Sequence, residues 1–122
     1  MRQLNDSDKI RFDRQMRIDG WGEKGQKKLK NATVGILGIG GLGCPISIYL
    51  AVAGVGKIIL VDKDTVELSN LNRQILHWNK DINKFKALSA KQKLSEINPD
   101  VEIITYTEEV NENNIEGIFD GV

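Results

Sequence analysis

Three short apolar runs predict the strands of a single sheet. They span residues 34–37, 57–62 and 101–106 and are rich in Val, Ile and Leu. Short runs of such residues, bounded by glycine or polar segments, are typical of strands with both faces buried. Strands of this kind occur in parallel sheets, where a helix usually carries the chain from one strand to the next.

The segments between these runs have the spacing of helices. The first repeats apolar residues at intervals of three or four, which predicts one buried face: Leu42, Ile46, Leu50 and Ala53. Pro45 falls in its first turn, where a missing N–H has little effect, and Gly54 ends it. The second helix is predicted at residues 84–97 and stops at Asn98-Pro99. Its apolar face consists of four residues: Ala87, Ala90, Leu94 and Ile97.

Helical segments are also predicted at both ends of the chain. Residues 5–18 form a first helix that polar residues cap at its start. Its apolar contacts come from three side chains: Ile10, Phe12 and Met16. Residues 23–30 form a short polar helix, and residues 111–119 form one more after the last strand. The polar stretch at residues 65–79 is expected to be irregular, with at most a short helical turn.

Charge and composition exclude several classes of protein. The chain has 17 basic and 17 acidic side chains, so no net charge attracts it to nucleic acid or to an anionic membrane. No apolar run reaches the ~20 residues that span a bilayer, and the amino terminus lacks a signal-peptide core. The single cysteine allows neither an internal disulfide nor a paired-cysteine metal site. We expect a cytoplasmic protein with no nucleic-acid or membrane partner.

A glycine-rich turn follows the first predicted strand and opens the next helix. Its pattern, Gly38-x-Gly40-x-x-Gly43, is the one that lets backbone N–H groups approach a phosphate at a helix start. Asp62 ends the second strand, about 20 positions after the turn, where a carboxylate accepts hydrogen bonds from ribose. The alternative is that the glycines only form a tight turn and that Asp62 is a solvated strand end. Loop, context and acid together favour nucleotide binding.

The order of elements therefore predicts an α/β fold with a Rossmann-like parallel sheet. We expect an incomplete doubly wound half (βαβαβ) preceded by two amino-terminal helices. Residues 1–32 are the helical segment, and residues 33–122 are the nucleotide-binding half. A full doubly wound domain continues with more strands, so we expect a truncated half: an amino-terminal fragment, a truncated product or part of a split protein.

The stretch from Asp62 to Gln74 resembles a family signature. Its sequence, DKDTVELSNLNRQ, is similar to the segment after the second strand in the MoeB/ThiF/HesA family of ubiquitin-activating-enzyme-like, ATP-dependent adenylyltransferases. Further similar segments are RFDRQ near the amino terminus, the glycine loop followed by Cys44, and AGVG before the second strand. The resemblance runs from about residue 10 to about residue 105. The Asn70-x-x-Arg73-Gln74 element is its most specific part.

The resemblance implies ATP as the ligand. In that family the residues matching Arg73 and Lys86 hold the phosphates, and the arginine matching Arg14 comes from the neighbouring subunit of a homodimer. A triphosphate needs several cations close together, so these three residues are also the candidates for catalysis on chemical grounds. The expected nucleotide-binding set is Gly38, Gly40, Gly41, Gly43, Asp62, Asp64, Asn70, Arg73, Gln74 and Lys86.

Two points weaken individual assignments. The family lysine usually lies in a Gly-x-Pro-Lys segment, whereas this chain has Asn83-Lys84-Phe85-Lys86, and Lys84 is a competing candidate. Arg14, Arg73 and Lys86 are otherwise ordinary surface residues, since most Lys and Arg side chains are exposed. Asp64 is placed to reach the ribose or a magnesium ion, and a structural hydrogen bond is an equal alternative.

The resemblance also implies the partners of the parent enzyme. They are ATP and a ubiquitin-like sulfur-carrier protein of the molybdopterin or thiamin type, whose carboxyl-terminal glycine is adenylated. Magnesium accompanies ATP in the parent. Structural zinc is common there too, but its cysteine ligands are absent from this chain. We expect these 122 residues alone not to be catalytically competent.

Two other functions fit part of the pattern. An NAD- or FAD-binding oxidoreductase domain shares the glycine loop and Asp62, but it gives no role to Asn70, Arg73 or Lys86. A non-catalytic fragment that binds nucleotide or only dimerises is the other alternative. Cys44 is expected to be a small buried residue rather than a nucleophile, and His77 is expected to be structural or solvent-facing.

Overall fold

A three-stranded parallel sheet forms the centre of the computed structural model, which describes residues 1–122. Strands β1 (Thr33–Leu37), β2 (Lys57–Val61) and β3 (Glu102–Tyr106) lie in the order β1-β2-β3. Their registers align all three amino-terminal ends, with Thr33 opposite Lys57 and Lys57 opposite Glu102. The predicted α/β, Rossmann-like fold is confirmed.

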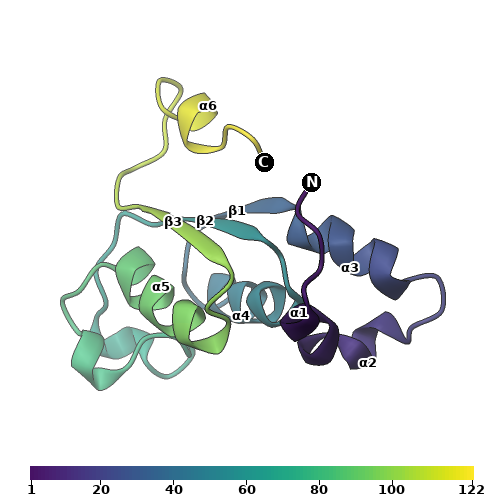
Figure 1. Cartoon of the computed structure of the whole chain (residues 1–122). Coiled ribbons are helices and arrows are strands. Elements are labelled where there is room, and N and C mark those ends of the chain that lie inside the picture. The colour runs from purple at the N-terminus through teal and green to yellow at the C-terminus, as the bar shows by residue number, and fades with distance from the viewer.

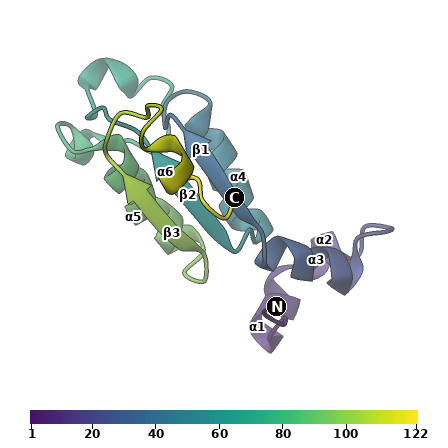
Figure 2. The same cartoon turned by 90° about the horizontal axis from the view of Figure 1, so that it is seen from above.

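Helices cover both faces of this sheet. Helix α4 (Gly43–Ala53) joins β1 to β2, and α5 (Lys86–Ile97) joins β2 to β3; both lie on one face (Figure 1). The four-residue helix α6 (Ile115–Ile118) lies on the other face, and Figure 2 looks down on it with the sheet beneath. The helix predicted at residues 111–119 is therefore too long. The Asn111 side chain instead accepts from the amides of Asn113 and Asn114 and forms a turn before α6.

Three helices gather where the strands begin: α1 (Asp6–Arg11), α2 (Asp13–Met16) and α3 (Gly22–Lys30) (Figure 1). The single helix predicted for residues 5–18 is wrong, because the chain breaks at Phe12 (φ −105°, ψ 11°). The break turns the Phe12 ring inward against Gly54, where a Cβ would lie 2.7 Å from the ring. Ile10, a predicted apolar contact, is exposed instead.

Helix α4 packs through its smallest side chains rather than its largest. Cys44, Ser47 and Ala51 are fully buried against the sheet. Of the predicted apolar face, Leu42 and Ile46 are exposed, so the prediction is wrong for these two, whereas Leu50 is partly buried against the core. The small residues allow the helix axis to lie close to the strands, and bulky residues in their place have no room. In α5 the predicted face is largely confirmed, with three of its residues buried: Ala87, Ala90 and Leu94.

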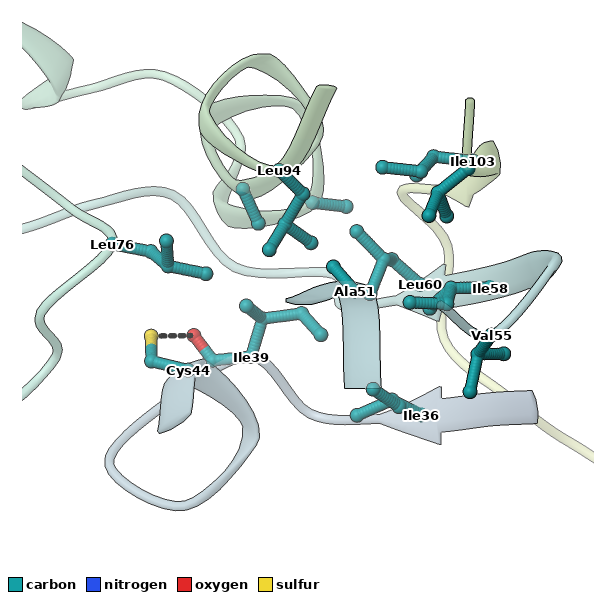
Figure 3. Close-up of a cluster of buried hydrophobic side chains, with 13 residues drawn as sticks. Ile36, Ile39, Cys44, Ala51, Val55, Ile58, Leu60, Leu76, Leu94 and Ile103 are labelled. Atoms are coloured by element: carbon teal, nitrogen blue, oxygen red, sulfur yellow. Dashed lines mark hydrogen bonds between the residues drawn. The ribbon is translucent and has the colours of Figure 1, made fainter. Parts of the chain in front are cut away.

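The alternating side chains of β2 supply two hydrophobic clusters. Ile58 and Leu60 point into the larger cluster, between the sheet and α4 and α5 (Figure 3). Ile59 and Val61 point to the opposite face, where they contact Ile118 of α6. A strand buried on both faces explains why its sequence is uniformly apolar.

The long connection from β2 to α5 contains two short 3₁₀ helices, η1 (Leu68–Asn70) and η2 (Asn79–Asp81). A buried ion pair between Lys93 of α5 and Asp81 ties η2 to α5. The Trp78 amide also donates to Asp81, at 2.9 Å. Burial alone raises the pKa of the Asp81 carboxyl, but these hydrogen bonds more than compensate and hold that pKa below its ordinary value.

Removing one member of this pair is expected to destabilise the fold strongly. Lys93→Met leaves the buried Asp81 carboxylate with only the exposed Lys84 as a cation, at 3.8 Å, and loss of the buried partner costs about 3–5 kcal/mol in comparable pairs. Lys91→Met, at an exposed position of the same helix, is the matched control and should change stability by less than about 0.5 kcal/mol. Urea unfolding followed by circular dichroism measures both. Equal stabilities of the two variants would contradict the importance of the pair.

Candidate functional site

The glycine loop runs from the end of β1 into α4. Gly38 has φ +92°, a conformation that side chains disfavour, and its amide donates to Val61 in β2 at 2.8 Å. A Cβ at Gly43 would lie 2.0 Å from the Gly38 carbonyl oxygen. Gly38 is therefore required by its backbone conformation, and Gly43 by the close approach of the helix to the turn.

Four successive amides follow this turn without an acceptor. The N–H groups of Gly40, Gly41, Leu42 and Gly43 form no hydrogen bond within the chain. They lie at the amino-terminal end of α4, an eleven-residue helix, where the helix dipole concentrates partial positive charge. Unpaired amides at such an end are suited to bind an anion such as phosphate.

Asp62 is a buried carboxylate that holds the start of this loop. Its Oδ2 accepts from the Ile39 amide at 2.8 Å, and its Oδ1 accepts from the Asp64 amide at 2.8 Å. The glycine-loop motif predicts that Asp62 accepts a hydrogen bond from a ribose hydroxyl. Each carboxylate oxygen accepts more than one hydrogen bond, so the structural contacts are compatible with that role.

The loop after β2 brings Arg73 against the glycines. The Cγ and Cδ atoms of Arg73 lie 3.9 Å from the position of a Cβ on Gly41. Its Nη1 donates to the Ser69 carbonyl at 3.0 Å and to the Asn72 side chain at 2.9 Å. The guanidinium is exposed and has no carboxylate partner, so its charge is available beside the free amides.

Gln74 and Asn70 shape the same segment. Gln74 is buried with its Nε2 3.5 Å from the position of a Cβ on Gly40, and its Oε1 has no hydrogen-bond partner. Asn70 is buried as well, and its Oδ1 accepts from the Glu67 amide at 2.9 Å. Asn70 thus forms the turn that carries Arg73 and Gln74 to the glycine loop.

Lys86 is the first residue of α5 and is buried to 8% exposure. Its amide donates to the Asp64 carbonyl at 3.0 Å, but its ammonium forms no ion pair or hydrogen bond within the chain. The charge of Lys86 acts on the pKa of both Cys44 and His77, which places it near the glycine loop. The competing Lys84 is exposed and pairs with Asp81 at 3.8 Å.

A pocket of about 300 Å³ opens where the three strands end. Nine residues line it: Leu37, Gly38, Val61, Asp62, Lys63, Asp64, Glu108, Glu109 and Val110. Glu108, Glu109 and Val110 belong to no motif in the sequence. They follow β3, and the carboxyl ends of parallel strands meet at one edge of the sheet, which is the signal that identifies them.

Two candidates lie outside this constellation. Arg14 is exposed on α2, near the start of the strands, so one chain does not bring it to the glycine loop (Figure 1). Cys44 is fully buried, and burial raises the pKa of its thiol, which agrees with a packing role. Its sulfur donates to the Ile39 carbonyl at 3.7 Å (Figure 3). No helix in the structure has the length and apolar character needed to cross a membrane.

The close approach at Gly43 gives a test of the loop geometry. Gly43→Ala forces the Gly38 carbonyl to move and should destabilise the chain by about 1–3 kcal/mol, as overpacking does elsewhere. Gly41→Ala is the control, because the nearest atom to its Cβ is 3.9 Å away. Urea unfolding compares them. The geometry described above would be wrong if Gly43→Ala were no less stable than Gly41→Ala.

Comparisons with known proteins agree with this geometry. The ThiF family model matches residues 12–122. The adenylyltransferase and sulfurtransferase UBA4 of Saccharomyces cerevisiae (strain YJM789) is 46% identical over 112 residues, covering 91% of this chain and 26% of UBA4. The chain therefore spans about a quarter of the length of this relative.

Two solved structures share the fold. Escherichia coli tRNA N6-threonylcarbamoyladenosine dehydratase, TcdA, in complex with ATP matches with a TM-score of 0.89 and 28% identity, over 98% of this chain and 48% of that one. Escherichia coli MccB with ATP matches with a TM-score of 0.72 and 39% identity, over 75% of this chain and 28% of that one. With the family model matching nearly its whole length, the chain belongs to the ThiF family.

Proposed function

We propose that this chain is the nucleotide-binding part of an ATP-dependent adenylyltransferase that activates the carboxyl-terminal glycine of a ubiquitin-like sulfur-carrier protein. The observation that carries the proposal is the row of four unpaired amides at the start of α4, with an unpaired arginine beside it. The UBA4 name and the ATP complexes of TcdA and MccB support the same activity and ligand.

The charges of the site divide it into a phosphate end and a nucleoside end. Arg73 and Lys86, both without an acidic partner, lie on the side of the free amides and are proposed to hold the phosphates. The pocket at the strand ends is walled by four carboxylates, those of Asp62, Asp64, Glu108 and Glu109, and by one cation, Lys63, which pairs with Glu109 at 3.5 Å and leaves the wall negative overall. Such a wall repels phosphate, so the pocket is proposed to take the ribose and the base, with Asp62 accepting from ribose hydroxyls.

The proposed reaction needs no general base from the protein. The carrier's carboxylate is already ionised and attacks the α-phosphorus of ATP. An O–P bond forms there while the bond from that phosphorus to the bridging oxygen breaks, giving an acyl-adenylate and pyrophosphate. The free amides, Arg73 and Lys86 would stabilise the charge on the phosphates as it redistributes.

Arg14 enters this proposal only through a second copy of the chain. It is remote from the glycine loop within one chain, so a catalytic role for it requires a homodimer in which the partner presents Arg14 to the phosphates. Magnesium in the parent enzyme would add charge neutralisation at the phosphates. No group of three or more His, Cys, Asp or Glu side chains in the chain is arranged to hold a metal ion, so no residue is assigned to magnesium or zinc.

The phosphate role of Arg73 predicts a loss of ATP affinity on its removal. Arg73→Ala should weaken ATP binding by about tenfold or more, the effect of one lost charge-assisted hydrogen bond. Calorimetric titration of the chain with ATP measures it. Because Arg73 is exposed, stability should be nearly unchanged. Wild-type affinity in this variant would count against the assignment.

Lys86 and Lys84 make a matched pair for the second cation. Lys86→Met is expected to weaken ATP binding by about tenfold, whereas Lys84→Met should stay within about twofold of wild type, because Lys84 is directed toward Asp81. The same titration decides between them, and the reverse order of affinities would transfer the role to Lys84.

ATP and NAD should be compared side by side, since an NAD- or FAD-binding domain shares the glycine loop and Asp62. We expect ATP to bind more tightly, because Arg73 and Lys86 match a triphosphate better than a dinucleotide. Tighter binding of NAD would favour an oxidoreductase. Pyrophosphate exchange into ATP by this chain alone would exclude a merely non-catalytic fragment.

A further inference from the structure

His77 is a buried side chain that neither the family resemblance nor the proposed reaction assigns to a role. Only 2% of it is exposed. Its Nε2 lies 2.8 Å from the Ile39 carbonyl oxygen, inside the glycine loop, and its Nδ1 lies 2.9 Å from the Ser89 hydroxyl of α5. The ring therefore connects the loop that approaches the phosphates to the helix that begins with Lys86.

The directions of these hydrogen bonds are fixed by the groups at the two ends. A carbonyl only accepts, so His77 Nε2 carries the proton and donates to Ile39. In the neutral ring Nδ1 then accepts, and the Ser89 hydroxyl, whose other acceptor is the Leu76 carbonyl at a longer 3.4 Å, donates to it at 2.9 Å. Lys93 donates to Ser89 at 2.8 Å and to Asp81 as well. One continuous chain of donors thus runs from the buried ion pair to the glycine loop, and such chains strengthen each member.

The neutral ring that this chain requires is also the form that the surroundings favour. Burial lowers the pKa of His77, and the nearby charges of Lys93 and Lys86 lower it further. The hydrogen bond to Ile39 and the charge of Asp81 act in the opposite direction without reversing the shift. His77 is consequently neutral at pH 7, with one nitrogen donating and the other accepting.

The bond to Ile39 controls a peptide plane that faces the ligand. The carbonyl of Ile39 and the amide of Gly40 belong to the same planar trans peptide, so the C=O and N–H bonds point in opposite directions. When His77 holds the carbonyl on the buried side, the Gly40 N–H is held on the opposite side. Gly40 carries the first of the four unpaired amides. The preceding peptide is held in the same manner by Asp62, which accepts from the Ile39 N–H.

We propose that His77 is a positioning residue that orients the Gly40 amide for binding a nucleotide phosphate. It touches no substrate and acts through the Ile39 carbonyl. This inference rests on the proposed ATP binding, and it predicts that the chain needs a neutral donor of the correct reach at position 77. Packing alone would require only a side chain of similar volume.

Two polar variants of His77 distinguish the need for a hydrogen-bond donor at the correct distance from the need for a side chain of similar volume. His77→Gln places an amide donor about as far from the backbone as Nε2, within reach of Ile39. His77→Asn keeps a polar group beside Ser89 but is too short for Ile39. Asn98→Leu is the control for lost stability, because Asn98 is also buried and donates to a carbonyl of α4, at Ala51 (2.9 Å), far from the glycine loop.

Calorimetric titration with ATP should be carried out at pH 7, under conditions where circular dichroism shows each variant folded. We expect His77→Asn to weaken ATP binding about tenfold, which corresponds to about 1.4 kcal/mol. His77→Gln should recover most of that loss, and Asn98→Leu should bind ATP within about twofold of wild type. If His77→Asn does not fold, Ser89→Ala replaces it, with an expected loss of about three- to tenfold, since the Nδ1 partner is removed.

Inorganic pyrophosphate gives an independent readout at the amide itself. In the ¹⁵N-labelled chain, the Gly40 amide resonance should shift saturably with pyrophosphate in the wild type and in His77→Gln, and much less in His77→Asn. Two results would overturn the positioning role alone. One is an ATP affinity of His77→Asn or Ser89→Ala that equals the affinity of Asn98→Leu. The other is a Gly40 response in His77→Asn that equals the response in wild type. A wild type that binds neither ATP nor pyrophosphate would overturn the proposed function, and this inference with it.

Discussion

The arrangement of the site depends on hydrogen bonds to the backbone of one residue, Ile39. Its N–H is held by Asp62 at the end of β2, and its carbonyl is held by His77 from the loop before α5, each at 2.8 Å, with a longer bond of 3.7 Å from the Cys44 thiol to the same carbonyl. The Ile39 side chain is fully buried in the main core. The glycine loop therefore starts from a point fixed by three parts of the chain, and the free amides that follow take their direction from it. Such pre-organisation reduces the entropy that ligand binding must otherwise overcome.

Under the proposed function, the electrostatic contrast across the site would let one small domain bind both halves of a nucleotide. Free amides, Arg73 and Lys86 supply positive potential where the helix begins, while carboxylates surround the pocket at the strand ends. Because neither Arg73 nor Lys86 has an acidic partner, their charges are not neutralised before a ligand arrives. A bound triphosphate would provide that neutralisation, and in the proposed site charge complementarity, rather than buried area, would be the main source of selectivity.

Much of the fold could be predicted from the sequence because its strands are short, uniformly apolar and separated by clear helix signals. The glycine loop and Asp62 could be predicted as well, since their spacing follows from the local geometry of a strand, a turn and a helix. The break at Phe12 could not, because no glycine or proline marks it and its cause is a contact with Gly54, distant in sequence. The contact between His77 and Ile39 also joins residues far apart along the chain.

The inward face of α4 was missed for a different reason. Nearly every residue of this helix is apolar, so spacing alone satisfies more than one face and cannot choose between them. Packing against the sheet determines which face of α4 turns inward, and the fully buried side chains on that face are small: Cys44, Ser47 and Ala51.

This choice reverses the usual pattern of mutational tolerance along a helix. In most amphipathic helices the largest apolar residues are the least replaceable. Here Leu42 and Tyr49 project away from the chain and tolerate replacement as far as this fold is concerned. Cys44 and Ala51, by contrast, are fully buried, where added volume is destabilising. Sequence variation in α4 should therefore concentrate at its bulkiest positions, and any constraint seen at those positions would point to contacts outside this chain.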